Sequence, residues 1–248
     1  ARYMPIDASA HGPGLDRINA LVHWLMLVLF VFWSAYFIFV LFRFRAKRNP
    51  KADYSGVKSH LSNYAEAGVA VIEVVLLVAF SIPAWSRWIK PPDESKNPLK
   101  IRVVAEQFAW NVHYPGPDGE FGKTDVKLVD GTNPLGLDMN DPHAKDDILS
   151  VNQLHLEVNR PVTIQLTSKD VIHSFGLPVM RVKQDAIPGT EIPVHFTPVK
   201  TSDPEKPWEI ACAQLCGLGH YRMRGFLSVG TKEQFEAFLA ANAPQPAI

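Results

Sequence analysis

Hydrophobic residues are unevenly distributed along the chain, and the two longest apolar stretches both lie within the first ninety positions. The stretch Ile18–Phe42 contains no Asp, Glu, Lys or Arg. As a helix it would be about 37 Å long, enough to cross a hydrocarbon core of roughly 30 Å. The stretch Ala65–Trp88 carries two acids but has a similar length. The pattern therefore predicts two transmembrane helices, at residues 18–42 and 65–89.

The segment between the two apolar stretches is strongly basic. Only Asp53 opposes its six cations, which are Arg43, Arg45, Lys47, Arg48, Lys51 and Lys58. Basic residues accumulate in short loops on the cytoplasmic side of a membrane. We therefore expect residues 43–64 to form a cytoplasmic loop. The N-terminal segment at residues 1–17 and everything after the second helix, including both termini, would then lie on the periplasmic side.

After a polar, proline-bearing linker at residues 90–100, the pattern changes to short stretches of alternating hydrophobicity. These are Ile101–Val104, Leu154–Val158, Val162–Leu166, Glu191–Phe196, Trp208–Ala211 and Phe226–Val229. Such spacing, with turn residues in between, is typical of an antiparallel β sandwich or barrel and predicts one all-β domain at residues 101–230. The stretch Pro115–Asp147, rich in Gly, Pro and Asp, is expected to leave the sheet as a long excursion. A capping-box pattern at residues 231–234 predicts a short helix within residues 231–248.

Composition narrows the function. The chain has 25 basic and 25 acidic residues, so its net charge gives no support to nucleic-acid binding. Its two cysteines, Cys212 and Cys216, are too few for a disulfide framework, and a bridge between them would close a very small loop. The cysteines therefore need another explanation.

The cysteines belong to a cluster of soft metal ligands that directly follows a predicted strand. Cys212, Cys216, His220 and Met223 are spaced C-x3-C-x3-H-x2-M. Thiolate, thioether and imidazole together suit copper, whereas structural zinc sites rarely use Met. A mononuclear blue-copper site needs one Cys, and here a second lies on the same loop. Two thiolates can bridge two copper ions, each completed by one His and one weaker ligand.

A second histidine is then required, and His173 supplies it, at the end of an alternating strand and about forty residues upstream. The weaker ligands would be the Met223 thioether and the main-chain carbonyl of Gln214. Two alternatives stay open: inert buried thiols, and a disulfide between the cysteines in an oxidising compartment. The other histidines are expected on the surface, in loops or, for His23, in packing at the membrane; they include His11, His60, His113, His143, His155 and His195.

Two motifs resemble the signature of the cytochrome c oxidase subunit II family: DVIHSFGLP followed by VKQDAIPG, and CAQLCGLGHYRM. The resemblance covers the whole chain. It implies a membrane α-helical hairpin followed by an all-β cupredoxin-like sandwich that carries a dinuclear copper centre, CuA. The family's copper ligands fall on six residues of this sequence: His173, Cys212, Gln214, Cys216, His220 and Met223.

The resemblance also implies a function and partners. Electrons would pass from a c-type donor through CuA to haem in subunit I, where oxygen is reduced to water and protons are pumped. Subunit III is a further expected partner, and the expected location is the bacterial inner membrane with the copper domain in the periplasm. The sequence has no C-x-x-C-H motif, so no haem is expected on this chain. The donor would be cytochrome c or a membrane-associated c-type cytochrome.

Proteins of other classes share parts of this pattern. A quinol-oxidase subunit II would have the hairpin and the sandwich but lack the copper ligands. A copper-delivery protein would not need the second apolar stretch, and the CuA domain of a nitrous-oxide-reducing enzyme would lack the hairpin.

The sequence departs from the family at two places near the metal ligands. The family usually has Glu at the position of Gln214, and that side chain reaches a magnesium ion at the interface with subunit I. Gln214 keeps the main-chain carbonyl but lacks the charge, so magnesium binding is expected to be weaker here. Phe108 takes the place of the family's electron-accepting tryptophan, with Trp110 two residues later. We expect both aromatic side chains at the outer surface near the copper loop, within a patch that matches the donor's charge. Its candidate acids are Asp118, Glu120, Asp138, Asp141, Asp146 and Asp147.

The second apolar stretch contributes one more candidate. Glu66 lies seventeen residues before Pro83, the spacing at which the family carries a carboxylate at the mouth of a proton channel into subunit I. The alternative is an acid that is simply solvated at the interface. Glu73, two turns deeper, is expected to face a polar partner in subunit I, because charge inside a membrane is costly.

Overall fold

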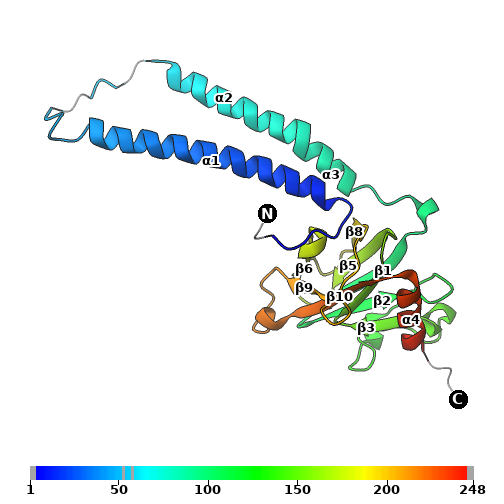
Figure 1. Cartoon of the computed structure of the whole chain (residues 1–248). Coiled ribbons are helices and arrows are strands. Elements are labelled where there is room, and N and C mark those ends of the chain that lie inside the picture. The colour runs from blue at the N-terminus through cyan, green and yellow to red at the C-terminus, as the bar shows by residue number, and fades with distance from the viewer. Residues whose placement is uncertain (1–3, 52–53, 57–58, 245–248) are drawn as a thin grey trace. The chain divides into compact units, whose positions relative to one another are not determined.

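The chain folds into two compact units in a computed structural model that describes residues 4–51, 54–56 and 59–244 (Figure 1). One unit is Gly14–Arg87, and the other combines Ala1–Pro13 with Trp88–Ile248. Asp53 and Lys58 of the predicted cytoplasmic loop lie outside the described residues.

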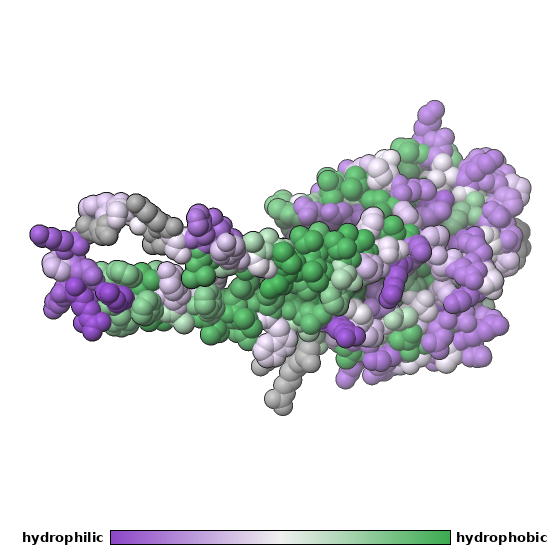
Figure 2. Space-filling model, turned by 90° about the horizontal axis from the view of Figure 1, so that it is seen from above, coloured by the Kyte–Doolittle hydropathy of each residue, from purple (hydrophilic) through white to green (hydrophobic). Residues whose placement is uncertain are grey.

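The first unit is a helical hairpin. Helix α1 spans Gly12–Arg43, and the second arm consists of α2 (Leu61–Leu76), the π-helical turn η1 (Leu77–Ser81) and α3 (Ile82–Trp88). Both arms are long and apolar enough to cross a membrane. Figure 2 shows hydrophobic residues along most of the hairpin and hydrophilic residues at its loop end. The two predicted apolar helices are therefore confirmed, and each extends a few residues beyond the predicted start.

The π-helical turn has a cause in the sequence. Pro83 follows it closely and has no backbone N–H, so the α-helical hydrogen bond to the carbonyl four residues earlier cannot form. Helices respond to such an interruption with a local π bulge or a kink.

The second unit is a sandwich of two five-stranded sheets, ordered β3-β2-β1-β5-β8 and β4-β10-β9-β6-β7. The strands are β1 (Leu99–Glu106), β2 (Ala109–Tyr114), β3 (Ile148–Val151), β4 (Gln153–Glu157), β5 (Val162–Ser168), β6 (His173–Leu177), β7 (Val182–Ala186), β8 (Ile192–Phe196), β9 (Trp208–Cys212) and β10 (Arg224–Gly230). Alternate residues face the core: in β5, Val162, Ile164 and Leu166 are buried. The predicted all-β sandwich is confirmed.

The expectation of purely antiparallel pairing is wrong. Strand β1 pairs in parallel with β5, and β10 pairs in parallel with β4. Parallel neighbours need a long connection between them. The first pair has such a connection, because β2, the excursion, β3 and β4 lie between β1 and β5 in the sequence.

Strand β2 was not predicted, and it explains how the excursion is placed. Trp110, Val112 and Tyr114 face the core, whereas Asn111 and His113 lie on the opposite face of the sheet. That outer face is also buried, since the excursion returns over it and Phe121 contacts the His113 ring edge to face at 4.9 Å between centroids. The excursion itself contains two short 3-10 helices, η3 (Val126–Leu128) and η4 (Pro142–Lys145).

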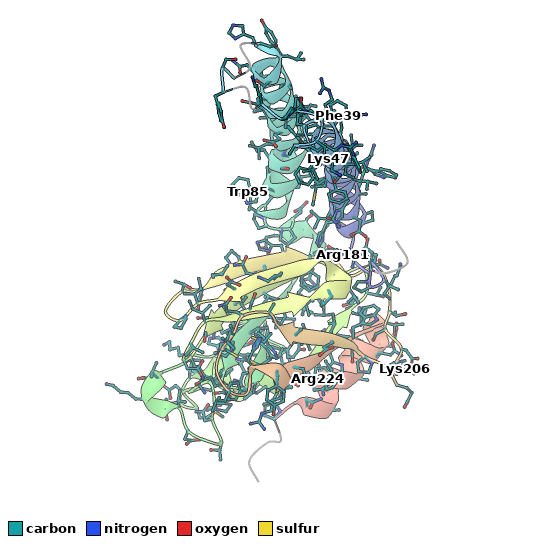
Figure 3. All side chains as sticks on the ribbon, turned by 90° about the vertical axis from the view of Figure 1, so that its left-hand side faces the viewer. Phe39, Lys47, Trp85, Arg181, Lys206 and Arg224 are labelled. Atoms are coloured by element: carbon teal, nitrogen blue, oxygen red, sulfur yellow. The ribbon has the colours of Figure 1, made fainter. Side chains whose placement is uncertain are left out.

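Residues 5–10, which we call the N-terminal strap, are part of the sandwich unit. The Ala8 N–H donates to the Val179 carbonyl at 2.8 Å, and the Ala8 carbonyl accepts from the Val199 N–H at 2.8 Å. The side chain of Arg181, labelled in Figure 3, donates to the Pro5 carbonyl at 2.9 Å. The strap therefore attaches to the β domain before the chain enters α1.

The C-terminal helix forms as predicted. Helix α4 (Lys232–Asn242) begins with a capping box in which Thr231 and Gln234 exchange side-chain and backbone hydrogen bonds. Its Phe235 is buried, and Phe238 stacks on His155 with ring centroids 3.8 Å apart. An amphipathic helix of this length is stabilised mainly by such packing.

Candidate metal centre

The loop between β9 and β10 carries most of the soft ligands and extends from one end of the sandwich, in orange in Figure 1. Cys212 ends β9 and Met223 directly precedes β10, and their backbones remain paired through a hydrogen bond of 3.3 Å from the Cys212 N–H to the Met223 carbonyl. His220 begins the short 3-10 helix η6 (His220–Arg222). The two strands thus hold both ends of the loop at fixed positions.

His173 reaches the loop from the neighbouring strand. It is the first residue of β6, not the end of a strand as predicted, because β5 ends at Ser168 and a turn separates the two. Strand β6 pairs with β9 so that Phe175 lies opposite Cys212. This pairing places the His173 ring beside the loop.

The ligand atoms converge. His173 Nδ1 lies 3.1 Å from Met223 Sδ and 4.0 Å from Cys212 Sγ. Cys216 Sγ lies 3.6 Å from His220 Nδ1, 3.7 Å from Met223 Sδ and 3.8 Å from Cys212 Sγ. The structure therefore brings together all five side chains that the sequence singled out.

The two thiols are free and lie in different surroundings. Their sulfur atoms are 3.8 Å apart, well beyond the disulfide bond length of about 2.05 Å. Burial raises the pKa of the Cys216 thiol to about 11, and the neighbouring Cys212 acts in the same direction. A buried thiol of this kind loses its proton only when a cation compensates the charge.

The Gln214 carbonyl also points into the cluster. It lies 3.2 Å from Cys212 Sγ, while the rest of the residue is exposed. Two thiols, a thioether, two imidazoles and a carbonyl form a soft donor set without a carboxylate. The chemistry of this set fits copper better than zinc, calcium or magnesium.

Phe108 packs directly on the loop between β9 and β10, residues 213–223, which we call the metal loop. A Cβ added to Gly219 would lie 2.4 Å from its ring, and one added to Gly217 would lie 2.7 Å from the side-chain nitrogen of Gln107. Gly217 also has φ +124°, a conformation that residues with a Cβ rarely adopt. These glycines let the loop backbone approach the half-buried ring, so the predicted proximity of Phe108 to the loop is found.

Trp110 does not lie at the outer surface, and that expectation is wrong. Its side chain is fully buried, with its ring 5.3 Å from that of Phe175 and 6.2 Å from that of His173. The physical reason is the alternation of β2, which turns every second side chain from Trp110 onward into the core.

Two of the acids proposed for the donor patch are buried as well. Asp147 bonds to His113 at 2.6 Å, and Asp141 accepts the Lys123 N–H at 2.9 Å. The expectation that His113 lies on the surface is also wrong, because the excursion covers the outer face of β2. The excursion also leaves β2 at Tyr114, the opposite end from Phe108, and six residues of strand extend roughly 20 Å. The acids of the excursion are therefore less suited to surround the metal loop with negative charge than the composition of the excursion suggested.

Glu66 and Glu73 both lie on α2 of the hairpin unit, exposed in the single chain. They are seven residues apart, so they lie on the same face of the helix. No hydrogen bond or ion pair in the described part of the chain involves either carboxylate.

Two residues next to the cluster were missed by the sequence reasoning. Asp170 accepts a hydrogen bond from His173 Nε2 at 2.8 Å, and Gln107 donates through Nε2 to the Cys216 carbonyl at 2.6 Å. Asp170 had a detectable signal, an acid three residues before the candidate histidine. Gln107 had none, since its partner lies 109 positions away.

Comparisons with known proteins point to one family. The family described as cytochrome C oxidase subunit II, periplasmic domain, matches residues 99–228. The alternative cytochrome c oxidase subunit 2 of Bradyrhizobium diazoefficiens is 30% identical over 225 residues, covering 90% of this chain and 78% of the relative. The cytochrome c oxidase subunit 2 of Synechocystis is 27% identical over 259 residues, covering 98% and 76%. Among solved structures, the periplasmic domain of subunit II of cytochrome oxidase from Bradyrhizobium japonicum is 28% identical with a TM-score of 0.42, covering 58% of this chain and 92% of that one.

Proposed function

The chain belongs to the cytochrome c oxidase subunit II family, and from this we propose that it takes electrons from a separate c-type cytochrome and passes them to haem in subunit I. A dinuclear copper centre, CuA, would supply the one-electron relay. Subunit I would reduce oxygen to water and pump protons, so this chain makes and breaks no covalent bond.

The position of the two thiols between two imidazoles carries this proposal. Cys212 faces His173 and Cys216 faces His220, with sulfur-to-nitrogen distances of 4.0 and 3.6 Å. One copper ion cannot use two thiolates, two imidazoles, a thioether and a carbonyl, whereas two ions bridged by the thiolates can use all six. We therefore assign His173, Cys212, Gln214 through its carbonyl, Cys216, His220 and Met223 as the copper ligands.

The surroundings of the cluster suit electron transfer. His173, Cys216 and Met223 are buried, and the strands on either side hold their backbones in place. A ligand set that cannot rearrange keeps the same geometry in the oxidised and the reduced state. The side chains of this chain would thus keep the reorganisation on electron transfer small.

Phe108 is the aromatic side chain that we propose for electron uptake, because it is half-buried and packs on the loop. The large hydrophobic side chains of that loop are exposed, with Leu215 75% exposed, Leu218 98% and Tyr221 86%, and the polar side chains of Gln214 and Arg222 are exposed beside them. The loop contains no acid between Cys212 and Arg224. We therefore propose an apolar contact with the donor, so that its rate of electron transfer changes little with ionic strength. A steep fall of the electron-transfer rate with added salt would instead support a docking patch of acidic residues.

The orientation in the membrane follows from charge and connectivity. The basic loop between the helices would lie in the cytoplasm, and the β domain with both termini in the periplasm of a bacterial inner membrane. The N-terminal strap supports this topology, since it hydrogen-bonds to the β domain and must lie on the same side. Subunit I and subunit III are the proposed membrane partners. Gln214 offers no carboxylate for magnesium, so we assign no magnesium site to it.

Copper loading of the full chain in detergent tests the proposal. We expect two copper ions per chain, a near-infrared absorption band and an electron paramagnetic resonance signal of one electron shared by two coppers. Cys216→Ser should abolish the shared signal, because a hydroxyl does not bridge metals as a thiolate does. One zinc ion, or one copper with a blue-site spectrum, would overturn the assignment. A soluble domain for the same test should begin near Lys90, since a start at Ile101 would remove two residues of β1.

Glu66 is proposed as the carboxylate that collects protons for subunit I. Glu66→Gln should slow oxygen consumption by the assembled oxidase, while copper content and copper reduction by the donor stay unchanged. Glu73→Gln is the matched control on the same helix face, and its main effect should be on assembly. Turnover at the wild-type rate in Glu66→Gln would show that Glu66 is only an interfacial acid.

A further inference from the structure

Asp170 forms a hub of hydrogen bonds beside the cluster. It lies in the turn between β5 and β6, and its side chain is 31% exposed. Its Oδ1 accepts from His173 Nε2 at 2.8 Å and from the Val171 N–H at 2.6 Å. Its Oδ2 accepts from the Gln107 N–H at 2.7 Å. One carboxylate therefore holds a metal-facing imidazole and the turn between β1 and β2.

Gln107 extends this network to the second cysteine. Its backbone N–H donates to Asp170, while its side-chain Nε2 donates to the Cys216 carbonyl at 2.6 Å. His173, Asp170, Gln107 and Cys216 thus form one connected path around the cluster. Phe108, the next residue after Gln107, is held against the metal loop by the same turn.

The geometry points to Asp170 as a positioning residue that orients the His173 imidazole toward the sulfur ligands and anchors the Gln107–Phe108 turn on the metal loop. This inference rests on the proposed copper function. A carboxylate only accepts hydrogen bonds when ionised, so Nε2 of His173 must carry the hydrogen. The lone pair is then on Nδ1, the nitrogen that faces Met223 Sδ at 3.1 Å and Cys212 Sγ at 4.0 Å.

The Asp170 carboxylate accepts three hydrogen bonds, from His173, Gln107 and Val171, and is fixed beside the imidazole by them. An anion hydrogen-bonded to a ligating imidazole increases the basicity of that ligand and stabilises the oxidised, more positively charged state of a metal. Asp170 should therefore strengthen copper binding and lower the reduction potential of the centre.

Asp170→Asn tests this, because the amide has nearly the same shape but brings a donor N–H₂ against the N–H groups of His173 or Gln107. In the full chain in detergent, we expect copper affinity to fall 10- to 100-fold in competition with a chelator. We also expect the reduction potential to rise, measured by redox titration of the near-infrared band. Asp185→Asn is the matched control: it removes a carboxylate from β7, opposite Ser174 of β6, and should leave both quantities unchanged.

Gln107→Leu separates the two arms of the network. It keeps the backbone N–H that reaches Asp170 but loses the hydrogen bond to the Cys216 carbonyl. We expect the copper spectrum and potential to stay close to wild type while the rate of copper reduction by the donor falls several-fold. An unchanged rate would remove the anchoring role.

The wild-type chain is measured first, so that failure of this inference differs from failure of the copper proposal. A wild type that does not bind two coppers overturns both. A wild type with two coppers and an Asp170→Asn variant with affinity within twofold and an unshifted potential overturns only the role of Asp170. If Asp170→Asn fails to fold, Ser168→Ala serves as the second variant. The Ser168 hydroxyl donates to the Val171 carbonyl at 2.5 Å and accepts from the Asp170 N–H at 3.4 Å, so its loss should loosen the turn that holds Asp170 and shift the potential in the same direction.

Discussion

Two histidines of the β domain are fully buried and hydrogen-bonded to a carboxylate, yet they serve different ends. His173 donates from Nε2 to Asp170, and its Nδ1 faces the sulfur atoms of the metal loop. His113 bonds through Nε2 to Asp147 at 2.6 Å, and its Nδ1 has no hydrogen-bond partner among the described residues. Aromatic packing against Phe121 covers it instead.

The difference shows that a buried histidine–carboxylate pair does not by itself mark a metal site. What distinguishes His173 is the chemistry facing its second nitrogen, two thiols and a thioether on one loop. Asp147 instead accepts a second hydrogen bond from the Gly122 N–H at 2.8 Å, which ties the excursion to the outer face of the sheet. The His113 pair therefore serves the fold, whereas the His173 pair is the one that we propose for metal binding.

The largest effect should follow from replacing His173, the buried histidine of the proposed metal site. His173→Asn removes one of two imidazole ligands, so the two coppers become inequivalent and the shared-electron signal should disappear entirely. Electron paramagnetic resonance of the copper-loaded chain checks this. The metal-free variant should still fold, and a retained shared-electron signal would exclude His173 as a ligand.

The next largest effect is expected from replacing His113, the buried histidine that stabilises the fold. His113→Leu leaves the buried Asp147 carboxylate without its main partner, which should lower the free energy of unfolding by about 3–5 kcal/mol. Urea unfolding of the metal-free chain, followed by tryptophan fluorescence, measures it. Copper stoichiometry and spectrum should not change in the folded protein.

The double variant His113→Leu with Asp147→Asn is the control for this interpretation. The amide that replaces the Asp147 carboxylate keeps an acceptor for the Gly122 N–H but carries no charge, so about half of the lost stability should return. If the double variant is as unstable as the single one, the loss comes from packing around Phe121 and not from the unpaired charge of Asp147.

A smaller effect is expected from Met223→Leu, which tests how much the thioether contributes to the proposed metal site. The side chains have similar volume, so the fold should lose less than about 1.5 kcal/mol although Met223 is buried. The thioether is a weak ligand, and two coppers should still bind with affinity reduced less than tenfold. Redox titration should show a shifted potential, and loss of one copper ion would mean that Met223 contributes more than a weak bond.

The smallest effect is expected from His155, which stacks on an aromatic ring and is not paired with a carboxylate. Burial against Phe238 of α4 lowers the pKa of His155 from its ordinary value of 6.5. The unfolded chain then binds the proton more readily than the folded one, so stability is full above pH 6.5 and decreases as the pH falls below it. Melting temperatures between pH 7.5 and pH 5 should show this slope, and His155→Gln should reduce it.

The sequence was sufficient where the determining residues are close together along the chain. The two spans, the capping box of α4 and the C-x3-C-x3-H-x2-M loop are local patterns, and the structure brings the loop residues together with His173. The sequence was insufficient where a distant segment of the chain determines the environment of a side chain. His113 alternates outward in β2 as a solvent-facing residue would, and only the excursion buries it.

The wrong expectation for Trp110 and the missed role of Gln107 have different causes. Trp110 was expected at the surface because it lies close to Phe108 in the sequence. The alternation of Trp110, Val112 and Tyr114 already indicated that these three side chains face the core. The hydrogen bond from Gln107 to Asp170 joins residues 63 positions apart, so no local pattern announces it.

The N-terminal strap changes how the protein should respond to proteolysis. The chain connects the sandwich unit to the hairpin at two places, through the strap before α1 and through the linker before β1. A protease that cuts only the linker would leave the two fragments joined without a covalent bond, because the strap stays paired along the edge formed by residues 197–199 and 179. The nicked β domain should therefore co-purify with the helical hairpin until a denaturant separates them.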